Sequence, residues 1–170
     1  MEELRIPGPT PCPPEVLQAM ARQMINHRGE EFQGILMGVT DNLKQLFQTK
    51  NDLYILTASG TGGLEAAIVN VLSPDDKVLS VSIGAFGDRF ATMAERFGAE
   101  VTRLSFEWGK PADPDEVRRA LQKDSKIKAV LVTHNETSTG VTNDLGAISL
   151  VVKEFNKLLL VDAISSLGSI

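Results

Sequence analysis

Five small residues in a row, Ser59-Gly60-Thr61-Gly62-Gly63, are the first feature of this sequence that could do chemistry. They follow an apolar run and precede a segment with helical spacing. Glycines leave the backbone N–H groups accessible at the start of a helix, where the helix dipole favours an anion. The turn predicts a phosphate-binding loop that contains Thr61, Gly62 and Gly63. A tight turn without a ligand is the alternative.

Two common phosphate motifs do not fit this turn. The dinucleotide fingerprint needs a small residue three positions after Gly62, where Glu65 stands. A nucleotide P-loop ends in Gly-Lys followed by Ser or Thr, and the sequence has no such ending. An unrelated, flavodoxin-like anion-binding protein stays open as a further hypothesis.

Three more side chains follow apolar, strand-like runs. Asp162 follows the run LLLV, Phe86 lies between two glycines, and Thr137 has a hydroxyl in the segment HNETSTG. A carboxylate, an aromatic face and a phosphate loop together suit a phosphorylated cationic ring, and pyridoxal phosphate is such a group. Taken singly, each residue has a structural alternative: a helix cap, a core phenylalanine or a loop cap. His134 and Glu136 could serve acid–base chemistry, but a framework role is favoured.

The elements that must position these residues alternate between strands and helices. Alternation of this kind predicts βαβ crossovers and a mostly parallel sheet, with ligands beyond the carboxyl ends of the strands. Before residue 51 we expect an extended proline-rich arm and two helices, at 14–25 and 30–48. The predicted strands are 53–58, 77–82, 100–105, 128–133 and 158–161, and the predicted later helices are 62–71, 87–97, 113–122 and 145–156.

Composition narrows the class of protein. The 170 residues are 42% hydrophobic and 23% charged, as in ordinary globular proteins, and the formal net charge of −5 disfavours nucleic-acid binding. One cysteine, Cys12, and two histidines give little material for a metal site, so we expect none. No apolar run has the length of a membrane span, and the start does not have the pattern of a signal peptide. We therefore expect a cytoplasmic protein that binds neither nucleic acid nor membrane.

Six segments follow one another in the order PGPTPCPPEV, NHRGEEF, SGTGGLEAAIVN, GAFGDR, THNETSTG and LLLVDAISSLG. In this order they resemble the class V aminotransferases of fold type I, the group of alanine–glyoxylate, serine–pyruvate and serine–glyoxylate aminotransferases. The resemblance spans nearly the whole chain. It implies a three-layer α/β/α fold with a mostly parallel sheet. Residues 1–50 would be the N-terminal arm and helices, and 51–170 part of the large cofactor-binding domain.

The resemblance also assigns roles to residues. Thr61, Gly62 and Gly63 match the phosphate loop of pyridoxal phosphate, and Phe86 matches the position that stacks on its ring. Thr137 matches the hydroxyl near the ring oxygen. Asp162, the one catalytic residue expected in this chain, matches the acid on the ring nitrogen. In some relatives the segments that contain Gly8, His27 and Arg28 approach the substrate.

The family's Schiff-base lysine, substrate-binding arginine and small C-terminal domain are expected outside this chain. The resemblance therefore implies the N-terminal portion of a homodimeric transaminase. It would move an amino group between a small amino acid, alanine or serine, and a 2-oxo acid, glyoxylate or pyruvate. The 170 residues alone are expected to be inactive. The alternative is a non-catalytic fragment or subunit of a larger assembly, such as the small subunit named for cyanobacterial soluble hydrogenase.

Overall fold

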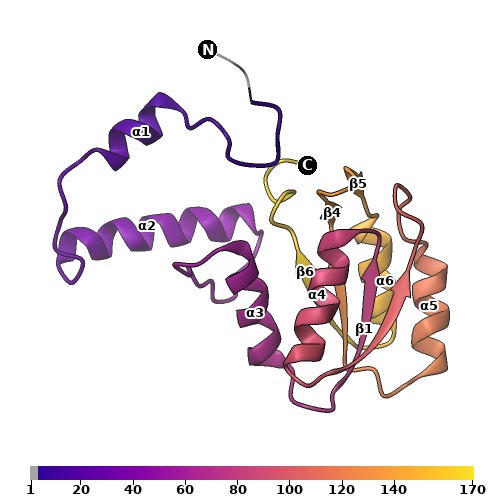
Figure 1. Ribbon diagram of the computed structural model, residues 1–170. Helices are drawn as coiled ribbons and strands as arrows, with labels where there is room; N and C mark the ends of the chain where they lie inside the picture. Colours follow the sequence, from indigo (N-terminus) through magenta and orange to yellow (C-terminus); the bar gives the residue numbers. More distant parts are fainter. Residues whose placement is uncertain (1–3) are drawn as a thin grey trace. The chain divides into compact units, whose positions relative to one another are not determined.

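The computed structural model describes residues 4–170, and contacts within the chain divide it into two units, 1–57 and 58–170. The first unit holds an N-terminal segment without regular structure, followed by two helices (Figure 1). Helix α1 spans Pro14–Met20 and has a proline in its first turn, where the missing N–H costs nothing. Helix α2 spans Glu30–Leu46, with acidic residues in its first turn and Lys44 in its last. Neither helix buries a residue.

The second unit is built on a parallel sheet with the strand order β2-β1-β3-β6. Its strands are β1 (Lys77–Ser82), β2 (Glu100–Ser105), β3 (Ala129–Thr133) and β6 (Leu158–Asp162). Nearly every residue of β1 and all of β3 are buried, because helices cover both faces of these two central strands. A two-stranded antiparallel hairpin, β4 (Asn135–Glu136) and β5 (Val141–Thr142), follows β3.

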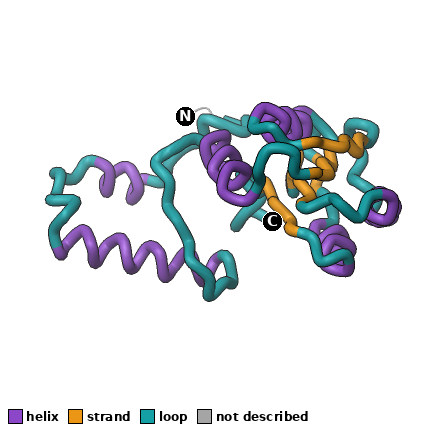
Figure 2. The backbone as a smooth tube through the Cα atoms, turned by 90° about the horizontal axis from the view of Figure 1, so that it is seen from below, coloured by secondary structure: helices purple, strands orange, loops and turns teal. Residues whose placement is uncertain are grey.

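Helices lie on both faces of this sheet, and in Figure 2 the strands of this unit have helices around them. On one face α3 (Gly60–Val71) and α4 (Ala85–Arg96) contribute Leu64, Ile68, Phe90 and Ala94 to one hydrophobic cluster. On the other face α5 (Pro114–Lys123) and α6 (Leu145–Glu154) contribute to a second cluster with residues such as Val117 and Ile148. The predicted three-layer fold with a mostly parallel sheet is confirmed.

One predicted strand is wrong. Residues 53–58 form no strand, and Tyr54, Ile55 and Leu56 are at least half exposed. The run has the β-branched and aromatic residues that strands favour, but a strand also needs a neighbour to accept and donate its ladder hydrogen bonds. Among residues 4–170 no strand pairs with this run.

The other predicted elements exist, with bounds that differ by a few residues. The largest difference is α1, which ends at Met20 rather than Ile25, since none of its side chains is buried to stabilise further turns. Within the described chain no helix is long and apolar enough to cross a membrane. Over the same residues no group of three or more His, Cys, Asp or Glu side chains could hold a metal ion.

Candidate functional site

The carboxyl ends of β1, β3 and β6 lie at one edge of the sheet, because the three strands run parallel and in register. Phe86 lies in the first turn of α4, which follows β1, the turn between β4 and β5 after β3 contains Thr137, and β6 ends at Asp162. The first turn of α3 lies close to the loop after β6. A Cβ atom on Gly60 would be 2.3 Å from Ile164 Cδ1. The parts of the predicted site within residues 58–170 are therefore brought together.

The N-terminus of α3 has free hydrogen-bond donors. Ser59 caps the helix by accepting a hydrogen bond from Gly62 N–H on its side chain, at 3.4 Å, while Gly63 N–H donates to the Ser59 carbonyl. The amides of Gly60 and Thr61 have no acceptor among the described residues. A Cβ on Gly63 would meet nothing within 4 Å, so the space beside this turn is open. Free amides and open space at a helix N-terminus suit an anion.

The N-terminus of α4, by contrast, is already occupied by a carboxylate of the protein itself. Glu136 is fully buried and accepts hydrogen bonds from Phe86 N–H, at 3.2 Å to each carboxylate oxygen, and from Gly87 N–H at 3.0 Å. Ser138 accepts from Ala85 N–H. The framework role favoured for Glu136 from the sequence is what these contacts describe. Of the two helix N-termini, only that of α3 is left for an external anion.

Asp162 is 5% exposed, and its carboxylate is only partly satisfied. Oδ1 accepts a hydrogen bond from Ile164 N–H at 3.1 Å, and Oδ2 accepts a long one, 3.4 Å, from Thr133 Oγ1. No Lys, Arg or His in the described part of the chain forms an ion pair with it. A buried carboxylate without a cationic partner is costly, so this one is suited to a cationic group that enters from outside.

Thr137 is half-buried and donates a hydrogen bond from Oγ1 to Ser165 Oγ at 2.9 Å. Ser165 in turn donates to the carbonyl and the side-chain oxygen of Asn135. His134 Nδ1 lies 3.0 Å from Ser166 Oγ, so this histidine also contacts the loop after β6 rather than open solvent. The hydroxyl of Thr137 is therefore held in place by the loop that begins at Asp162.

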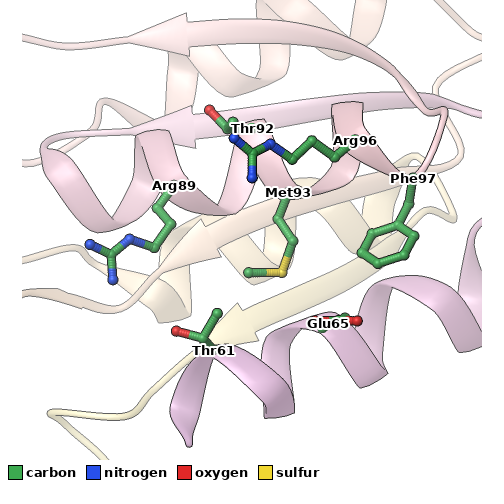
Figure 3. Close-up of a pocket in the computed structure, with 7 residues that line it drawn as sticks. All are labelled: Thr61, Glu65, Arg89, Thr92, Met93, Arg96 and Phe97. Atoms are coloured by element: carbon green, nitrogen blue, oxygen red, sulfur yellow. The ribbon is translucent and has the colours of Figure 1, made fainter.

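Phe86 is half-buried, and the guanidinium carbon of Arg89 lies 5.1 Å from the centroid of its ring, within reach of a cation–π contact. Arg89 also lines a pocket of about 560 Å³ between α3 and α4 (Figure 3). Arg89 and Thr61 lie toward one end of this pocket, and Phe97 lies toward the other. Thr61 is the residue that this pocket shares with the predicted cofactor site, because neither Phe86 nor Asp162 lines the pocket.

These features can be compared with known proteins. The family model described as "Aminotransferase class-V" matches residues 4–170. The chain belongs to the class V aminotransferases. The enzymes of this family depend on pyridoxal phosphate. A cofactor with a phosphate and a pyridine ring matches the two open features of the site, the α3 N-terminus and the Asp162 carboxylate.

Individual class V relatives resemble the chain along nearly all of its length. A protein named "Soluble hydrogenase 42 kDa subunit" from Anabaena cylindrica is 49% identical over 98% of this chain and 44% of its own. A serine–glyoxylate aminotransferase from Methylorubrum extorquens is 39% identical over 98% of this chain and 43% of its own length. The crystal structure of an alanine–glyoxylate aminotransferase from Nostoc sp. superposes with a TM-score of 0.91 at 37% identity. The match covers 97% of this chain and 44% of that protein. The chain thus spans less than half the length of these relatives.

The predicted substrate residues of this class V chain lie in the 1–57 unit. Gly8 is in the exposed N-terminal segment, and His27 and Arg28 are exposed in the turn before α2. Their contact with substrate stays a prediction. Sequence reasoning assigned no role to Ser165, which bonds Thr137, or to Arg89, which contacts Phe86. A signal existed for Arg89, because an aromatic and a cation three residues apart share one face of a helix.

Proposed function

We propose that this chain is the N-terminal portion of a pyridoxal-phosphate-dependent aminotransferase. The proposed reaction moves an amino group between a small amino acid, alanine or serine, and a 2-oxo acid, glyoxylate or pyruvate. The observation that carries the proposal is the buried carboxylate of Asp162, which has no cationic partner in the described chain and lies at the same edge as the open N-terminus of α3. The names of the glyoxylate aminotransferases among the relatives support this substrate class.

The residues present fit the cofactor. The free amides at the start of α3, in the turn that contains Thr61, Gly62 and Gly63, would hold the phosphate. Phe86 would stack on the ring, and Thr137 would hydrogen-bond the ring oxygen. Asp162 would keep the pyridine nitrogen protonated, because a buried carboxylate favours a proton or a cation beside it. The bound cofactor supplies an electron sink for the carbanion that forms at the substrate's Cα atom.

Each residue of the proposed site then has a physical role. Asp162 holds a proton at the ring nitrogen, and the helix dipole of α3 holds the phosphate end. Phe86 shields one face of the ring from water. We further propose that Gly8, His27 and Arg28 contact the substrate, that the protein is a cytoplasmic homodimer, and that residues 1–170 alone do not catalyse the reaction.

The test replaces Asp162 by Asn in the full-length protein. The amide keeps the shape of the side chain but not its charge, so we expect the cofactor to bind more weakly. Transamination from alanine or serine to glyoxylate should fall by about a hundredfold or more, since the ring nitrogen is no longer kept protonated. Rates are measured with saturating cofactor. Near-normal turnover in Asp162→Asn would contradict the proposal and leave a structural carboxylate.

The name of the Anabaena cylindrica relative favours one alternative, a subunit of a hydrogenase assembly. Clusters of iron or nickel are held mainly by several cysteine thiolates. This chain has one cysteine, Cys12, which is exposed. The same assay separates the two functions, because a non-catalytic subunit would show no transamination in the wild-type protein.

A further inference from the structure

The carboxylate of Glu136 lies between the N-terminus of α4 and the loop after β3, two segments that would contact the proposed cofactor. Oε1 accepts hydrogen bonds from Phe86 N–H, from Ser138 N–H at 3.2 Å and from Ser138 Oγ at 2.6 Å. Oε2 accepts from Phe86 N–H and from Gly87 N–H. Glu136 is 0% exposed, and no cation of the described residues pairs with it. Four donor groups therefore replace the water that this charge would have in solution.

A buried charge of this kind persists only where the surrounding dipoles stabilise it. Here the stabilisation comes from α4, whose N-cap residue, Gly84, has no side chain to cap the helix. Glu136, 50 residues beyond Phe86 in the sequence, takes that role and lies at the positive end of the helix dipole. A neutral side chain of the same shape could not accept from all four donors, because an amide has only one acceptor oxygen.

The backbone around Glu136 is shaped to admit it. A Cβ atom on Gly84 would lie 2.6 Å from Glu136 Cγ and 2.7 Å from Ser138 Oγ, so a larger residue would push the glutamate away. Ser138 links the same parts a second time, since its hydroxyl accepts from Ala85 N–H and donates to Glu136. The start of α4 and the loop after β3 thus form one hydrogen-bonded unit.

Phe86 and Thr137 are the two residues of this hydrogen-bonded group that belong to the proposed cofactor site. The amide of Phe86 is bonded to Glu136, and Thr137 is the next residue after Glu136 in the chain. Any shift of the carboxylate moves the stacking ring relative to the hydroxyl. Neither the family match nor the contacts of Asp162 involve this coupling.

We propose that Glu136 is a positioning residue, which holds the stacking side chain of Phe86 and the hydroxyl of Thr137 in fixed relation on the cofactor ring. This inference rests on the proposed function for the identity of the ring. Glu136 itself touches no ring or substrate atom. It acts by fixing two backbone segments that come from different strands.

The main variant is Glu136→Gln in the full-length holoenzyme, with Asn143→Ala as the matched control. Asn143 is also buried, and it also bonds two backbone groups of separate segments, Ala112 N–H and the Thr133 carbonyl. Among the described residues it forms no hydrogen bond with Phe86 or Thr137. Both variants should lower the melting temperature, so stability alone does not distinguish them.

Two readouts distinguish them. The visible circular dichroism of bound pyridoxal phosphate reports the orientation of the ring in the site. The dissociation constant of pyridoxal phosphate reports how tightly the protein binds it. For Glu136→Gln we expect an altered dichroism band and a dissociation constant raised about tenfold. For Asn143→Ala we expect the wild-type band and a change of less than about twofold. A wild-type band and affinity in Glu136→Gln would overturn the proposal.

Amide hydrogen exchange of the cofactor-free protein provides a readout that does not depend on the proposed function. In Glu136→Gln, exchange should rise in both segments, 85–88 and 137–140, and in Asn143→Ala it should not rise at 85–88. If the wild-type protein bound no cofactor, the proposed function would fail, while this experiment would still test the coupling. Unchanged exchange in either segment would contradict it.

Ser138→Ala is the milder variant, for use if Glu136→Gln does not fold. It removes one donor to the carboxylate and the acceptor of Ala85 N–H. The same changes in dichroism and exchange are expected with smaller amplitude, and their absence would count against the proposal.

Discussion

Two carboxylates are buried at the same edge of the sheet, and their hydrogen-bond partners separate their roles. Glu136 accepts from four donor groups of the protein and has no capacity left for a ligand. Asp162 accepts one good and one long hydrogen bond. Since buried polar groups in native proteins are nearly always satisfied, the incompletely satisfied carboxylate of Asp162 supports the proposal that a ligand binds beside it. By the same argument, the proposed site of the anion is the N-terminus of α3, whose amides are free, and not that of α4, whose amides donate to Glu136.

A prediction at the residue scale concerns Gly63, where a side chain would enter open space. In Gly63→Leu we expect the free energy of unfolding to stay equal or rise by up to about 1 kcal/mol, because leucine is a better helix former than glycine. The affinity for pyridoxal phosphate should fall about tenfold or more, since the side chain takes the space of the anion. The affinity for pyridoxal, which has no phosphate, should hardly change. Fluorescence titration with both ligands measures this.

Gly34→Leu is the matched control, because Gly34 lies in α2 and a Cβ there also meets nothing within 4 Å. It should change neither affinity. Equal losses of affinity for both ligands in Gly63→Leu would show that the turn is merely deformed, and no loss would remove Gly63 from the phosphate loop.

At the scale of elements, the central strands of the 58–170 unit are stabilised from both faces of the sheet. Hydrophobic clusters cover both faces of β1 and β3. Charged pairs close the edge opposite the site, where Lys128, just before β3, contacts Asp76 at 2.6 Å and Lys77, the first residue of β1, contacts Asp124 at 2.8 Å. These pairs are partly exposed, so each alone contributes little to the free energy of unfolding. They nevertheless connect the first residues of strands to loops.

The Asp76 pair gives a pH-dependent prediction. The hydrogen bond from Lys128, followed by that from Ser73 N–H, holds the pKa of Asp76 below its ordinary value. A lowered native pKa stabilises the fold at neutral pH, and this contribution is lost as the pH falls through that pKa. We therefore expect Asp76→Asn to lower the melting temperature slightly at pH 7, and the difference from wild type to shrink toward pH 3.

Calorimetry at several pH values checks this, with Asp75→Asn as the control. Asp75 is exposed, forms no ion pair among the described residues, and has a φ of 67°, which asparagine also tolerates. A difference between Asp76→Asn and wild type that grew on acidification would contradict the assignment.

At the scale of the whole molecule, the 1–57 unit exposes several large apolar side chains. Helix α2 buries no residue, and Ile35, Leu36, Met37 and Val39 are each more than 40% exposed. Exposed apolar patches of this kind mark interaction sites. They support the proposed homodimer, in which a second copy would cover such a patch.

Sedimentation velocity tests the dimer. We expect the full-length wild-type protein to sediment as a dimer and Ile35→Glu to shift the population toward monomer by about tenfold or more in the dissociation constant, because a charge would be buried. Gln33→Glu adds the same charge at an exposed polar position of the same helix and should stay dimeric. A monomeric wild-type protein would disprove the proposal.

Local pattern alone determined most of the elements in the 58–170 unit. The largely apolar runs at 77–82 and 128–133 predicted strands, because strands covered on both faces have nearly continuous apolar sequences. The small residues at 59–63 predicted a helix start, and Asp162 stood out because a charged residue follows a buried run. The mostly parallel sheet follows from the alternation of strands and helices.

Tertiary structure decided what depends on distant partners. Residues 53–58 have the composition of a strand, but hydrogen bonds to a neighbour make a strand, and no sequence pattern records whether one is present. The sequence favoured a framework role for Glu136 and a ligand role for Asp162, but it could not name the hydrogen-bond partners of either carboxylate. Only the fold brings the α4 amides to Glu136 and leaves Asp162 short of partners, because hydrogen bonds between residues 50 apart depend on how the chain returns to the same edge of the sheet.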